Sequence, residues 1–519
     1  MQRKIYSAVF SSGLVSLAIE LSASRLLSNY FGSSNLIWAV IIGSILVYMT
    51  IGSILGGKWA DRSPHEKTLY GNLIWAAFTT GLIPCIAKPV LRSASIAMDH
   101  LQVAPLILSF VVVLLLFSIP MILLSMTSPF AIRLLVDDTQ HSGNTAGNIY
   151  AISTAGSFIG TFLPVLLLIP LLGTYRNFLI LSAILFIIAF WGLIRSQPGW
   201  KHILFKYAWM PLVVALAAWW GLRGSDKIAN GLLFETESQY NYIQVQQISG
   251  YNVLRLNEGQ GIHSIYRADT LNYQGTWQQI LAAPFFNTSP YSPESVKSIA
   301  VLGLAGGTSA RQAASVFTGS HIDGFEIDPE IVRIGYEYFA MDIPDLTVYT
   351  QDARVGLRSM DKQYQLISID AYRPPYIPAH LTTVEFFQEV YDHLSKDGVL
   401  VINVARIGED RRLADALATT IQRVFPSVYA CDVPDTFNTI LYATHALTNV
   451  ENLYNNYLWL DESGSVDSLL RSSLETTILN LKPITTSQLI FTDDHTPIEQ
   501  LMNTMLIDFY RSGGITNLQ

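Results

Sequence analysis

The chain has 519 residues, of which 50% are hydrophobic and only 14% are charged, and its formal net charge is −8. A composition this apolar is unusual for a soluble protein and indicates that part of the chain lies in a lipid bilayer. The mild charge, with no basic tract, argues against nucleic acid as a partner, and the two cysteines exclude both a disulfide framework and a cysteine metal cluster.

Seven apolar segments in the first 222 residues are each about long enough to cross a bilayer core as a helix. They are residues 5–27, 35–57, 69–90, 104–128, 147–172, 176–195 and 203–222. The first follows Arg3 and Lys4, as a signal peptide would, but it lacks a small-residue cleavage site. We therefore expect it to remain in the protein as an anchor.

Several residues inside these segments bear on packing and function. Glycines four residues apart, such as Gly156 and Gly160, predict helices that approach closely in lipid. We interpret Glu20 as facing a polar partner or a water-filled cavity, whereas we expect Arg25 to reach the interface. The loop at 56–62, GGKWADR, resembles a short loop of major facilitator transporters in which an acid and a base lock neighbouring helices.

Basic residues in the loops predict the orientation of the chain. The N-terminal side holds nine, and the other side holds four. The nine are Arg3, Lys4, Lys58, Arg62, Lys67, Arg133, Arg195, Lys201 and Lys206, and the four are Arg25, Lys88, Arg92 and Arg176. This bias places the N-terminus inside the cell, and an odd number of spans then places the C-terminal part outside. We expect a multi-pass protein of the bacterial inner membrane with an extracytoplasmic C-terminal domain, unless residues 203–222 lie along the interface, which would make the count even.

The pattern changes after residue 225. Residues 228–290 alternate apolar with polar residues between Gly and Asn turns, which predicts a small cap of antiparallel strands. Residues 291–519 alternate strands with helices, as in a doubly wound Rossmann-like domain. The expected strands are 298–303, 321–327, 346–350, 364–370 and 398–404, and the expected helices are 308–317, 329–339, 353–359 and 383–395. Residues 1–225 form the predicted multi-pass transmembrane domain.

A glycine turn at the start of this domain predicts a ligand site. It lies in the stretch 301–328, VLGLAGGTSARQAASVFTGSHIDGFEID. Gly303 allows a tight turn, and Gly306 and Gly307 let a ligand lie against backbone N–H groups at a helix N-terminus. Glu326 ends the next strand, where it can accept hydrogen bonds from ribose hydroxyls. The alternative interpretation is a strand–helix–strand crossover in which the small residues serve only to pack the helix against the sheet.

Two further acidic residues end strands over the same turn, Asp352 in QDAR and Asp370 in YQLISID. Three acidic strand ends favour a nucleoside ligand. We interpret His380 as orienting its loop, because no second titratable group is fixed beside it in sequence. Thr382 and Thr383 are the expected N-cap of the helix that begins at Val384.

The late motif FTDDHTPIEQL contains Asp493 and Asp494 beside His495. A metal site normally needs more ligands at helical or hairpin spacing. We therefore predict no metal site and interpret the motif as a turn that packs the C-terminal segment against the Rossmann-like domain.

The motifs SQYNYIQV, VLGLAGGTSAR, GFEIDPEIV, QDAR, ISIDAYRPPYIPAHLTTVEFF and DGVLVIN together resemble the spermidine synthase family of polyamine aminopropyltransferases, over about residues 234–447. The whole chain, including the late motif FTDDHTPIEQL, resembles bacterial membrane proteins described as fused major-facilitator/spermidine synthase-like, and this resemblance implies a structural or lid role for the motif. The resemblance implies a β-hairpin domain followed by a methyltransferase-type Rossmann domain. It also implies decarboxylated S-adenosylmethionine as donor and a carboxylate that takes a proton from the attacking amine.

The resemblance assigns roles residue by residue. Glu326 matches the ribose-binding acid, and Asp352 with Ala353 matches the pair that reads adenine. Gly306 stands where the family has an acid that orients the aminopropyl amine.

The catalytic loop also departs from the family. Asp370 matches its first acid, but Arg373 stands where the proton-accepting acid should be, and Asn241 replaces the usual Gln. Because a guanidinium is always charged and cannot accept a proton, transfer to an ordinary cationic diamine is not expected.

Three hypotheses follow. The first is a membrane-anchored transferase of the spermidine synthase type, which takes decarboxylated S-adenosylmethionine or S-adenosylmethionine as donor and has an altered acceptor site. The candidates for its base are Asp370, His380 and Glu385, of which Asp370 lies closest in sequence to the nucleoside end. The second is an S-adenosylmethionine-dependent methyltransferase-like enzyme, with Arg373 facing the donor carboxylate. The third is a non-catalytic membrane sensor or assembly module. The expected partners are the lipid bilayer, a small-molecule substrate such as an amine, and a second copy of the chain in a homo-oligomer.

Overall fold

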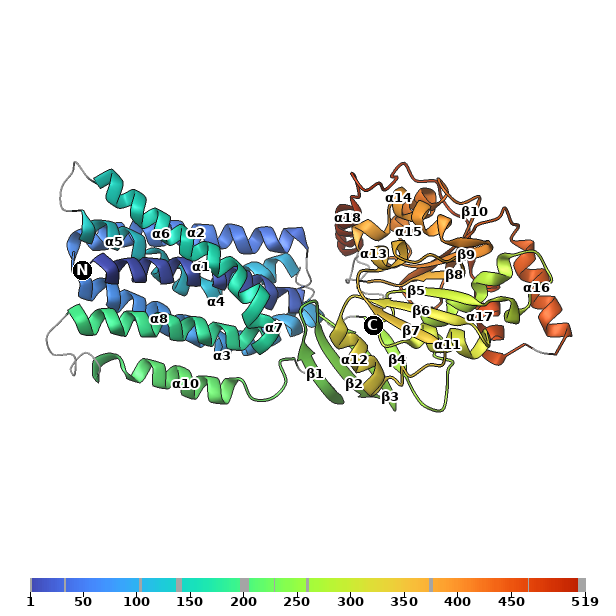
Figure 1. Ribbon diagram of the computed structural model, residues 1–519, viewed down its shortest axis with the longest axis horizontal. Coiled ribbons are helices and arrows are strands. Elements are labelled where there is room, and N and C mark those ends of the chain that lie inside the picture. The colour runs from blue at the N-terminus through green and yellow to red at the C-terminus, as the bar shows by residue number, and fades with distance from the viewer. Residues whose placement is uncertain are drawn as a thin grey trace. The chain divides into compact units, whose positions relative to one another are not determined.

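The computed structural model in Figure 1 describes residues 2–31, 34–101, 105–136, 142–196, 205–227, 229–257, 261–372, 377–464 and 466–511. The chain divides into two compact units. The first consists of Met1–Ala229 and Glu235–Tyr242, and the second consists of Asn230–Phe234 and Ile243–Gln519.

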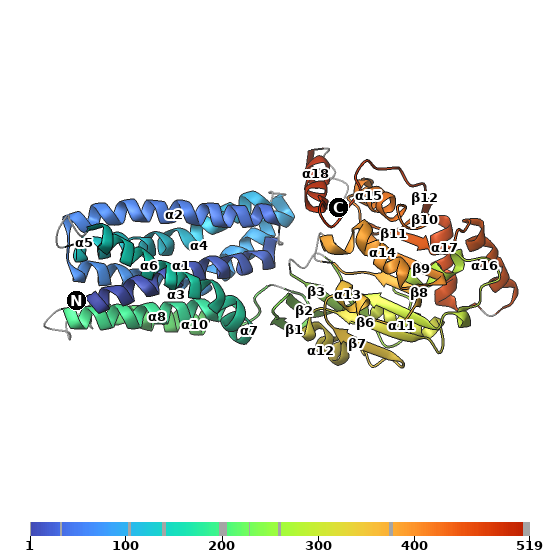
Figure 2. The same ribbon diagram turned by 45° about the horizontal axis from the view of Figure 1, so that its top comes forward.

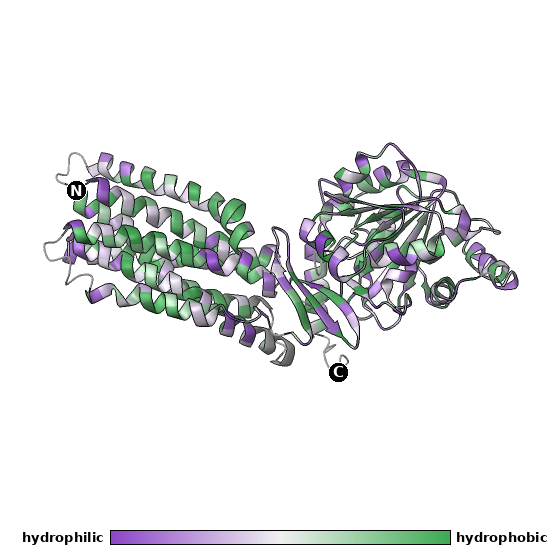
Figure 3. Ribbon diagram, turned by 60° about the horizontal axis from the view of Figure 1, so that its bottom comes forward, coloured by the Kyte–Doolittle hydropathy of each residue, from purple (hydrophilic) through white to green (hydrophobic). Residues whose placement is uncertain are grey.

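The first unit is a helical bundle. Its helices are α1 (Gln2–Phe31), α2 (Asn35–Arg62), α3 (Glu66–Leu101), α4 (Pro105–Ser125), α5 (Thr127–Leu135), α6 (Ser142–Leu163), α7 (Ile169–Leu172), α8 (Thr174–Ser196) and α10 (Trp209–Gly221), with a π-helical turn, η1 (Pro164–Leu168), between α6 and α7. Within the described ranges, six helical stretches are long and apolar enough to cross a membrane. Figure 3 shows apolar residues along these helices. The six correspond to the first six predicted segments, and their insertion in a bilayer stays a prediction.

The seventh predicted segment, 203–222, differs from the expectation. Its helix α10 has 13 residues, about 20 Å at 1.5 Å per residue, whereas a bilayer core is about 30 Å thick. The segment nevertheless runs along α3. The side-by-side pairs are Tyr207 with Gly71, Trp209 with Phe78, Val214 with Gly81 and Gly221 with Cys85.

Glycines bring helices of the bundle into close contact, as their spacing predicted. A Cβ at Gly156 or Gly160 of α6 would overlap the carbonyl oxygen of Phe10 or Leu14 in α1. The backbones of α1 and α6 therefore touch, which larger side chains would prevent.

Charged residues at the ends of the bundle find partners. Arg25 donates from Nε to Glu237 Oε1 at 3.0 Å and from Nη2 to the carbonyl oxygen of Ser238 at 2.7 Å. The segment after the last helix thus holds the guanidinium of Arg25, and its position at a membrane interface stays a prediction. The expected GGKWADR loop is instead the end of α2, where Asp61 lies 3.4 Å from Arg133 of α5, both largely exposed, so an acid of this motif pairs with a base of a neighbouring helix.

Two sheets follow the bundle along the chain, and the large one lies wholly within the second unit. The small sheet has the order β1 (Leu232–Glu237), β2 (Tyr242–Ile248), β3 (Tyr251–Leu256), β4 (Ser264–Tyr266). The large sheet has the order β12 (Leu481–Lys482), β10 (Ser427–Asp432), β11 (Asn438–Thr444), β9 (Leu394–Ala405), β8 (Tyr364–Ile369), β5 (Ser298–Leu302), β6 (His321–Glu326), β7 (Leu346–Thr350). Strands β5 to β9 pair in parallel, and β11 and β10 are antiparallel additions.

Helices cover both faces of the large sheet, as Figure 2 shows. Along β5, Ile299 and Val301 enter one apolar core, whereas Ala300 and Leu302 enter the other, because successive side chains point to opposite faces. The helices are α11 (Thr308–Val316), α12 (Pro329–Tyr338), α13 (Ala353–Arg358), α14 (Val384–Asp392), α15 (Arg412–Ile421), α16 (Glu451–Glu462), α17 (Ser468–Leu479), α18 (Ile498–Arg511) and the 3-10 helix η2 (Thr276–Phe286). The predicted Rossmann-like, methyltransferase-type fold is confirmed.

The order of the large sheet reverses at β5, whose neighbours are β6 on one side and β8 on the other. Open α/β sheets bind ligands at the carboxyl ends of the strands beside such a switch point. The loops after β5, β6, β7 and β8 therefore define the region in which a ligand is expected.

Candidate functional site

The turn after β5 requires glycine. Gly303 has φ +94°, and a Cβ on it would lie 2.6 Å from the carbonyl oxygen of Asp370 and 2.7 Å from Ala371. Only glycine allows the ends of β5 and β8 to approach this closely. Gly307, with φ +81°, forms the N-cap of α11. Gly303 thus has the tight-turn role expected of it, and Gly307 has a left-handed backbone conformation at the start of the helix.

Gly306 occupies a crowded position between the turn and strand β4. Its N–H donates to Ser264 Oγ at 2.8 Å, and the N–H of Gly307 donates to the carbonyl oxygen of Leu304 at 2.9 Å. A Cβ on Gly306 would lie 3.0 Å from both Phe339 Cγ and Ser264 Cβ. The two N–H groups that we expected to face a ligand therefore have partners within the protein. The small residue at 306 lets β4 and Phe339 pack against the turn.

Glu326 ends β6 directly beside this turn. Its Oε2 accepts a hydrogen bond from Ala305 N at 3.0 Å, and its Oε1 accepts one from Asp328 N at 3.1 Å. Only 8% of the residue is exposed. Burial raises the pKa of this carboxyl to about 7, against the lowering effect of the two backbone N–H groups. A buried carboxylate fixed by backbone N–H groups is well placed to accept hydrogen bonds from the hydroxyls of a sugar.

Asp352 follows β7 and is the N-cap of α13. Its Oδ1 accepts hydrogen bonds from the N–H groups of Arg354 and Val355, at 3.0 and 3.1 Å. Its Oδ2 lies 2.9 Å from Nε2 of His380. The fold thus brings a titratable group from a different loop beside His380, which its sequence neighbours do not supply, and its role in orienting its own loop stays a prediction. Ala353, the other half of the predicted adenine pair, is buried in the core.

Asp370 ends β8, where sequence reasoning placed the base. Asn403 of β9 donates from Nδ2 to Asp370 Oδ1 at 3.0 Å, and Asn438 of β11 donates to Asn403 Oδ1 at 2.8 Å. Burial raises the pKa of Asp370 to about 6, although the hydrogen bond from Asn403 lowers it. A carboxylate with this pKa can accept a proton near neutral pH. Arg373, which we predicted beside it, lies outside the described residues.

The helix after this loop, α14, begins at Val384 as predicted, and one of the two expected threonines is its N-cap. Thr383 is the N-cap of α14, with its hydroxyl oxygen accepting a hydrogen bond from Phe386 N at 3.2 Å. Thr382 is not part of this N-cap: it is the C-cap of the short 3-10 helix η4 (Ala379–Leu381), and its hydroxyl donates to the carbonyl oxygen of Ala379 at 2.7 Å.

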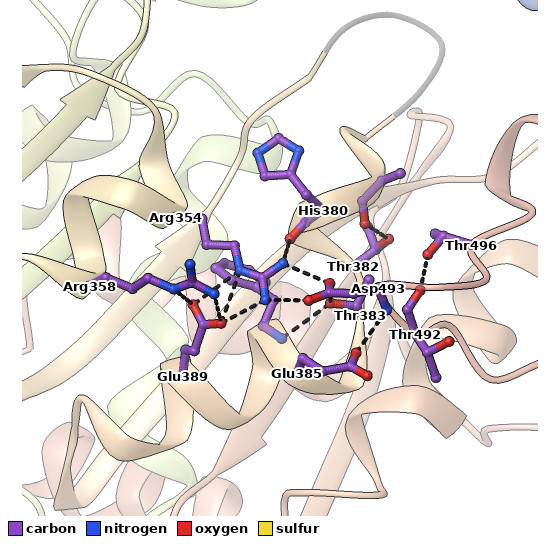
Figure 4. Close-up of polar contacts among 12 residues, drawn as sticks. Arg354, Arg358, His380, Thr382, Thr383, Glu385, Glu389, Thr492, Asp493 and Thr496 are labelled. Carbon is purple, nitrogen blue, oxygen red and sulfur yellow. Dashed lines mark hydrogen bonds and ion pairs between the residues drawn. The ribbon is translucent and has the colours of Figure 1, made fainter.

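The FTDDHTPIEQL turn packs against the start of α14, as we interpreted it. Asp493 Oδ1 accepts a hydrogen bond from Thr383 Oγ1 at 2.7 Å, and Asp493 N donates to Glu385 Oε2 at 3.0 Å. Figure 4 shows that Asp493 also meets Arg354, which sequence reasoning did not single out. The sequence feature that could have indicated Arg354 is its position in QDAR, directly after the predicted adenine-reading pair.

Three carboxylates, those of Glu326, Asp352 and Asp370, thus follow the carboxyl ends of β6, β7 and β8. Strands β5 to β8 run in parallel, so their carboxyl ends meet at one edge of the sheet. Two of these groups have a pKa shifted towards neutrality by burial. Such groups in one region indicate a functional site.

The amino-acid sequence is similar to known transferases in this region. The family described as the Spermine/spermidine synthase domain matches residues 286–455. A "Probable polyamine aminopropyl transferase" of Bifidobacterium longum is 34% identical over 219 residues, which cover 41% of this chain and 47% of that protein. The chain therefore spans about half the length of this relative.

Two further relatives extend the comparison. A "Polyamine aminopropyltransferase" of Vibrio vulnificus is 30% identical over 216 residues, covering 39% of this chain and 68% of that protein. A "Polyamine aminopropyltransferase 2" of Ralstonia nicotianae is 23% identical over 412 residues, covering 76% of this chain and 77% of that protein. The last alignment is longer than the second unit and so includes part of the helical bundle.

Proposed function

Because the chain belongs to the spermine/spermidine synthase family, we propose that its second unit is a transferase that uses an S-adenosylmethionine-derived donor. The helices of the first unit anchor it in a membrane. The observation that carries the proposal is the position of Glu326, a buried carboxylate hydrogen-bonded to the glycine turn at Ala305. Glu326 accepts the ribose hydroxyls of the donor, and Asp352 accepts its adenine amino group.

Asp370 is the proton acceptor in this proposal. Its pKa of about 6 leaves it ionised at neutral pH, and Asn403 fixes one of its oxygens. The acceptor nucleophile loses its proton to the other oxygen while it attacks the carbon next to the sulfonium. The thioether nucleoside then leaves as the neutral product.

The site of the aminopropyl amine is altered relative to the family. Gly306 occupies the position of the acid that orients this amine, and Ser264 and Phe339 pack so closely against it that a carboxylate would have to displace them. The amine of a decarboxylated donor therefore lacks a charged partner there, so we expect little aminopropyl transfer to putrescine.

The same glycine favours a second candidate, a methyltransferase-like enzyme. A donor that keeps its carboxylate would meet repulsion from an acid at position 306 and meets none from glycine. The two candidates differ in the group that is transferred. Incubation with each donor and a mixture of amines, followed by mass spectrometry, distinguishes a gain of an aminopropyl group from a gain of a methyl group.

Calorimetry on the full-length chain in detergent tests the donor site. We expect methylthioadenosine and at least one of S-adenosylmethionine and its decarboxylated form to bind. Glu326→Gln should weaken binding about tenfold or more, because a hydrogen bond to a charged group contributes about 1.5–3 kcal/mol. Absence of heat with all three ligands, in folded protein, would remove both enzyme candidates.

A further inference from the structure

The guanidinium of Arg354 has an acceptor for each of its five N–H donors. Its Nε–H points to the Glu389 carboxylate at 3.1 Å, and Nη2 donates to Glu389 Oε1 at 2.6 Å. Nη1 donates to the carbonyl oxygen of His380 at 3.0 Å and to Asp493 Oδ1 at 2.7 Å, and Nη2 also donates to Asp493 Oδ2 at 2.8 Å. Only 8% of the Arg354 side chain is exposed. Figure 4 shows these contacts converging from several segments.

Two of these five hydrogen bonds depend on Asp493 alone. Without its carboxylate, a mostly buried guanidinium would keep two donors with no acceptor, which is costly. The other acid, Glu389, cannot give full compensation, because it also pairs with Arg358. Asp493 therefore fixes the orientation of Arg354, in the two-point geometry that an arginine and a carboxylate favour.

Arg354 is in turn attached to the predicted adenine-reading residue at two places. Its backbone N–H donates to Asp352 Oδ1, and its side chain holds the carbonyl oxygen of His380, whose ring lies 2.9 Å from Asp352 Oδ2. A movement of Arg354 would therefore disturb two of the three groups that hold the Asp352 carboxylate, the third being the N–H of Val355. Fixing a carboxylate by surrounding hydrogen bonds is what allows it to read a base with precision.

We propose that Asp493 is a positioning residue for the adenine end of the donor site, and that the turn Thr492–Thr496 is part of that site. This inference rests on the proposed function. The turn lies beyond residue 455, where the match to the family ends. Its backbone is nevertheless held to the domain, since Val384 N donates to the carbonyl oxygen of Phe491 at 2.9 Å and Phe491 is fully buried. A segment outside the family match thus determines how strictly this chain recognises an amino group on the base.

The test compares methylthioadenosine with methylthioinosine, which carries a carbonyl in place of the adenine amino group. Both are titrated calorimetrically into the full-length chain in detergent. We expect Asp493→Ala to raise the Kd of methylthioadenosine about tenfold. It should also reduce the preference for the amino-bearing base about fivefold, because the Asp352 carboxylate is no longer fixed. If turnover is measurable, KM for the donor should rise more than kcat falls.

A matched control is available in the same C-terminal segment. Asp508 of α18 pairs with Arg412 at 2.8 Å and is 49% exposed, compared with 42% for Asp493. Asp508→Asn should leave the affinity and the base preference unchanged. Asp493→Asn, which keeps one acceptor oxygen, should fall between Asp493→Ala and the unaltered chain, and it replaces Asp493→Ala if that variant does not fold.

Two results would overturn the inference. One is a folded Asp493 variant with unaltered affinity and base preference. The other is an equal loss in Asp508→Asn, which would reduce the effect to general stability. Failure of the unaltered chain to bind any adenosyl ligand would instead count against the proposed function, so the two failures are distinguishable.

Discussion

Glu326 carries the pH dependence that we expect for donor binding. Burial raises the pKa of its carboxyl to about 7. The ionised form accepts hydrogen bonds from ribose hydroxyls on all its free lone pairs, whereas the protonated form has one oxygen occupied by a proton. Binding should therefore strengthen as the pH rises through 7 and weaken as it falls.

The size of this effect follows from the pKa. If only the ionised form binds, the Kd of methylthioadenosine should be about tenfold lower at pH 8 than at pH 6. Titrations at both pH values measure it. Glu326→Gln should bind methylthioadenosine weakly, with a Kd that does not change with pH. Asp370→Asn shows whether Asp370, the second carboxyl with a raised pKa, contributes to the pH dependence. A tenfold change that persists in Glu326→Gln would contradict the assignment.

Sequence reasoning located single residues better than it located their partners. The acids at 326, 352 and 370 could be placed because each ends a strand. The contact of His380 with Asp352 spans 28 residues and two different loops, and that of Arg354 with Asp493 spans 139 residues. Such contacts depend on the packing of α13, α14 and the C-terminal turn, which local pattern does not specify.

Among the elements, the contact of α1 with α6 is the most sensitive to side-chain size. Gly160→Val would drive a branched side chain into the backbone of Leu14, and overpacking of this kind typically costs about 1–3 kcal/mol. We expect a lower unfolding temperature in detergent, monitored by circular dichroism. Gly147→Val in the same helix is the control, because a Cβ there meets nothing within 4 Å. Equal unfolding temperatures would show that the two helices do not depend on this contact.

Prediction of the elements succeeded where strands and helices alternate. The expected strands 298–303, 321–327, 346–350 and 364–370 agree with β5 to β8 to within one residue at each end. Strands β10, β11 and β12 were not expected. β12 has only two residues and exists because it pairs with Ala430 and Cys431 of β10. A strand defined by its neighbour in this way has no periodicity to detect.

At the scale of the whole molecule, the contacts within the first unit favour an odd number of membrane-spanning segments. Lys4 lies 3.9 Å from Glu66 and donates to the carbonyl oxygen of Arg195, so the start of α3 and the end of α8 share one end of the bundle. Lys88 lies 2.7 Å from Asp226, which follows α10. The 22 residues of α3 between Glu66 and Lys88 span about 33 Å, close to a bilayer core of about 30 Å.

We therefore propose that the chain after α10 emerges on the side of the membrane opposite to the N-terminus. The loop charges predict that this opposite side lies outside the cytoplasm. Cysteine at Ser249, in the exposed turn between β2 and β3, should react with a membrane-impermeant maleimide in intact cells with an opened outer barrier. The background is a chain in which Cys85 and Cys431 are replaced by serine. Cysteine at His65, near the opposite end of the bundle, should react only after the inner membrane is broken. The reverse pattern would return the second unit to the cytoplasm.

The contact between Arg354 and Asp493 also sets an order of events during synthesis. Asp493 leaves the ribosome 139 residues after Arg354, roughly 7 to 28 s later at 5–20 residues per second. During this interval the residues of the first unit and of strands β5 to β7 have already been synthesised, whereas the guanidinium of Arg354 still lacks one of its two acids. A nascent chain should thus complete its membrane insertion well before it can discriminate between bases.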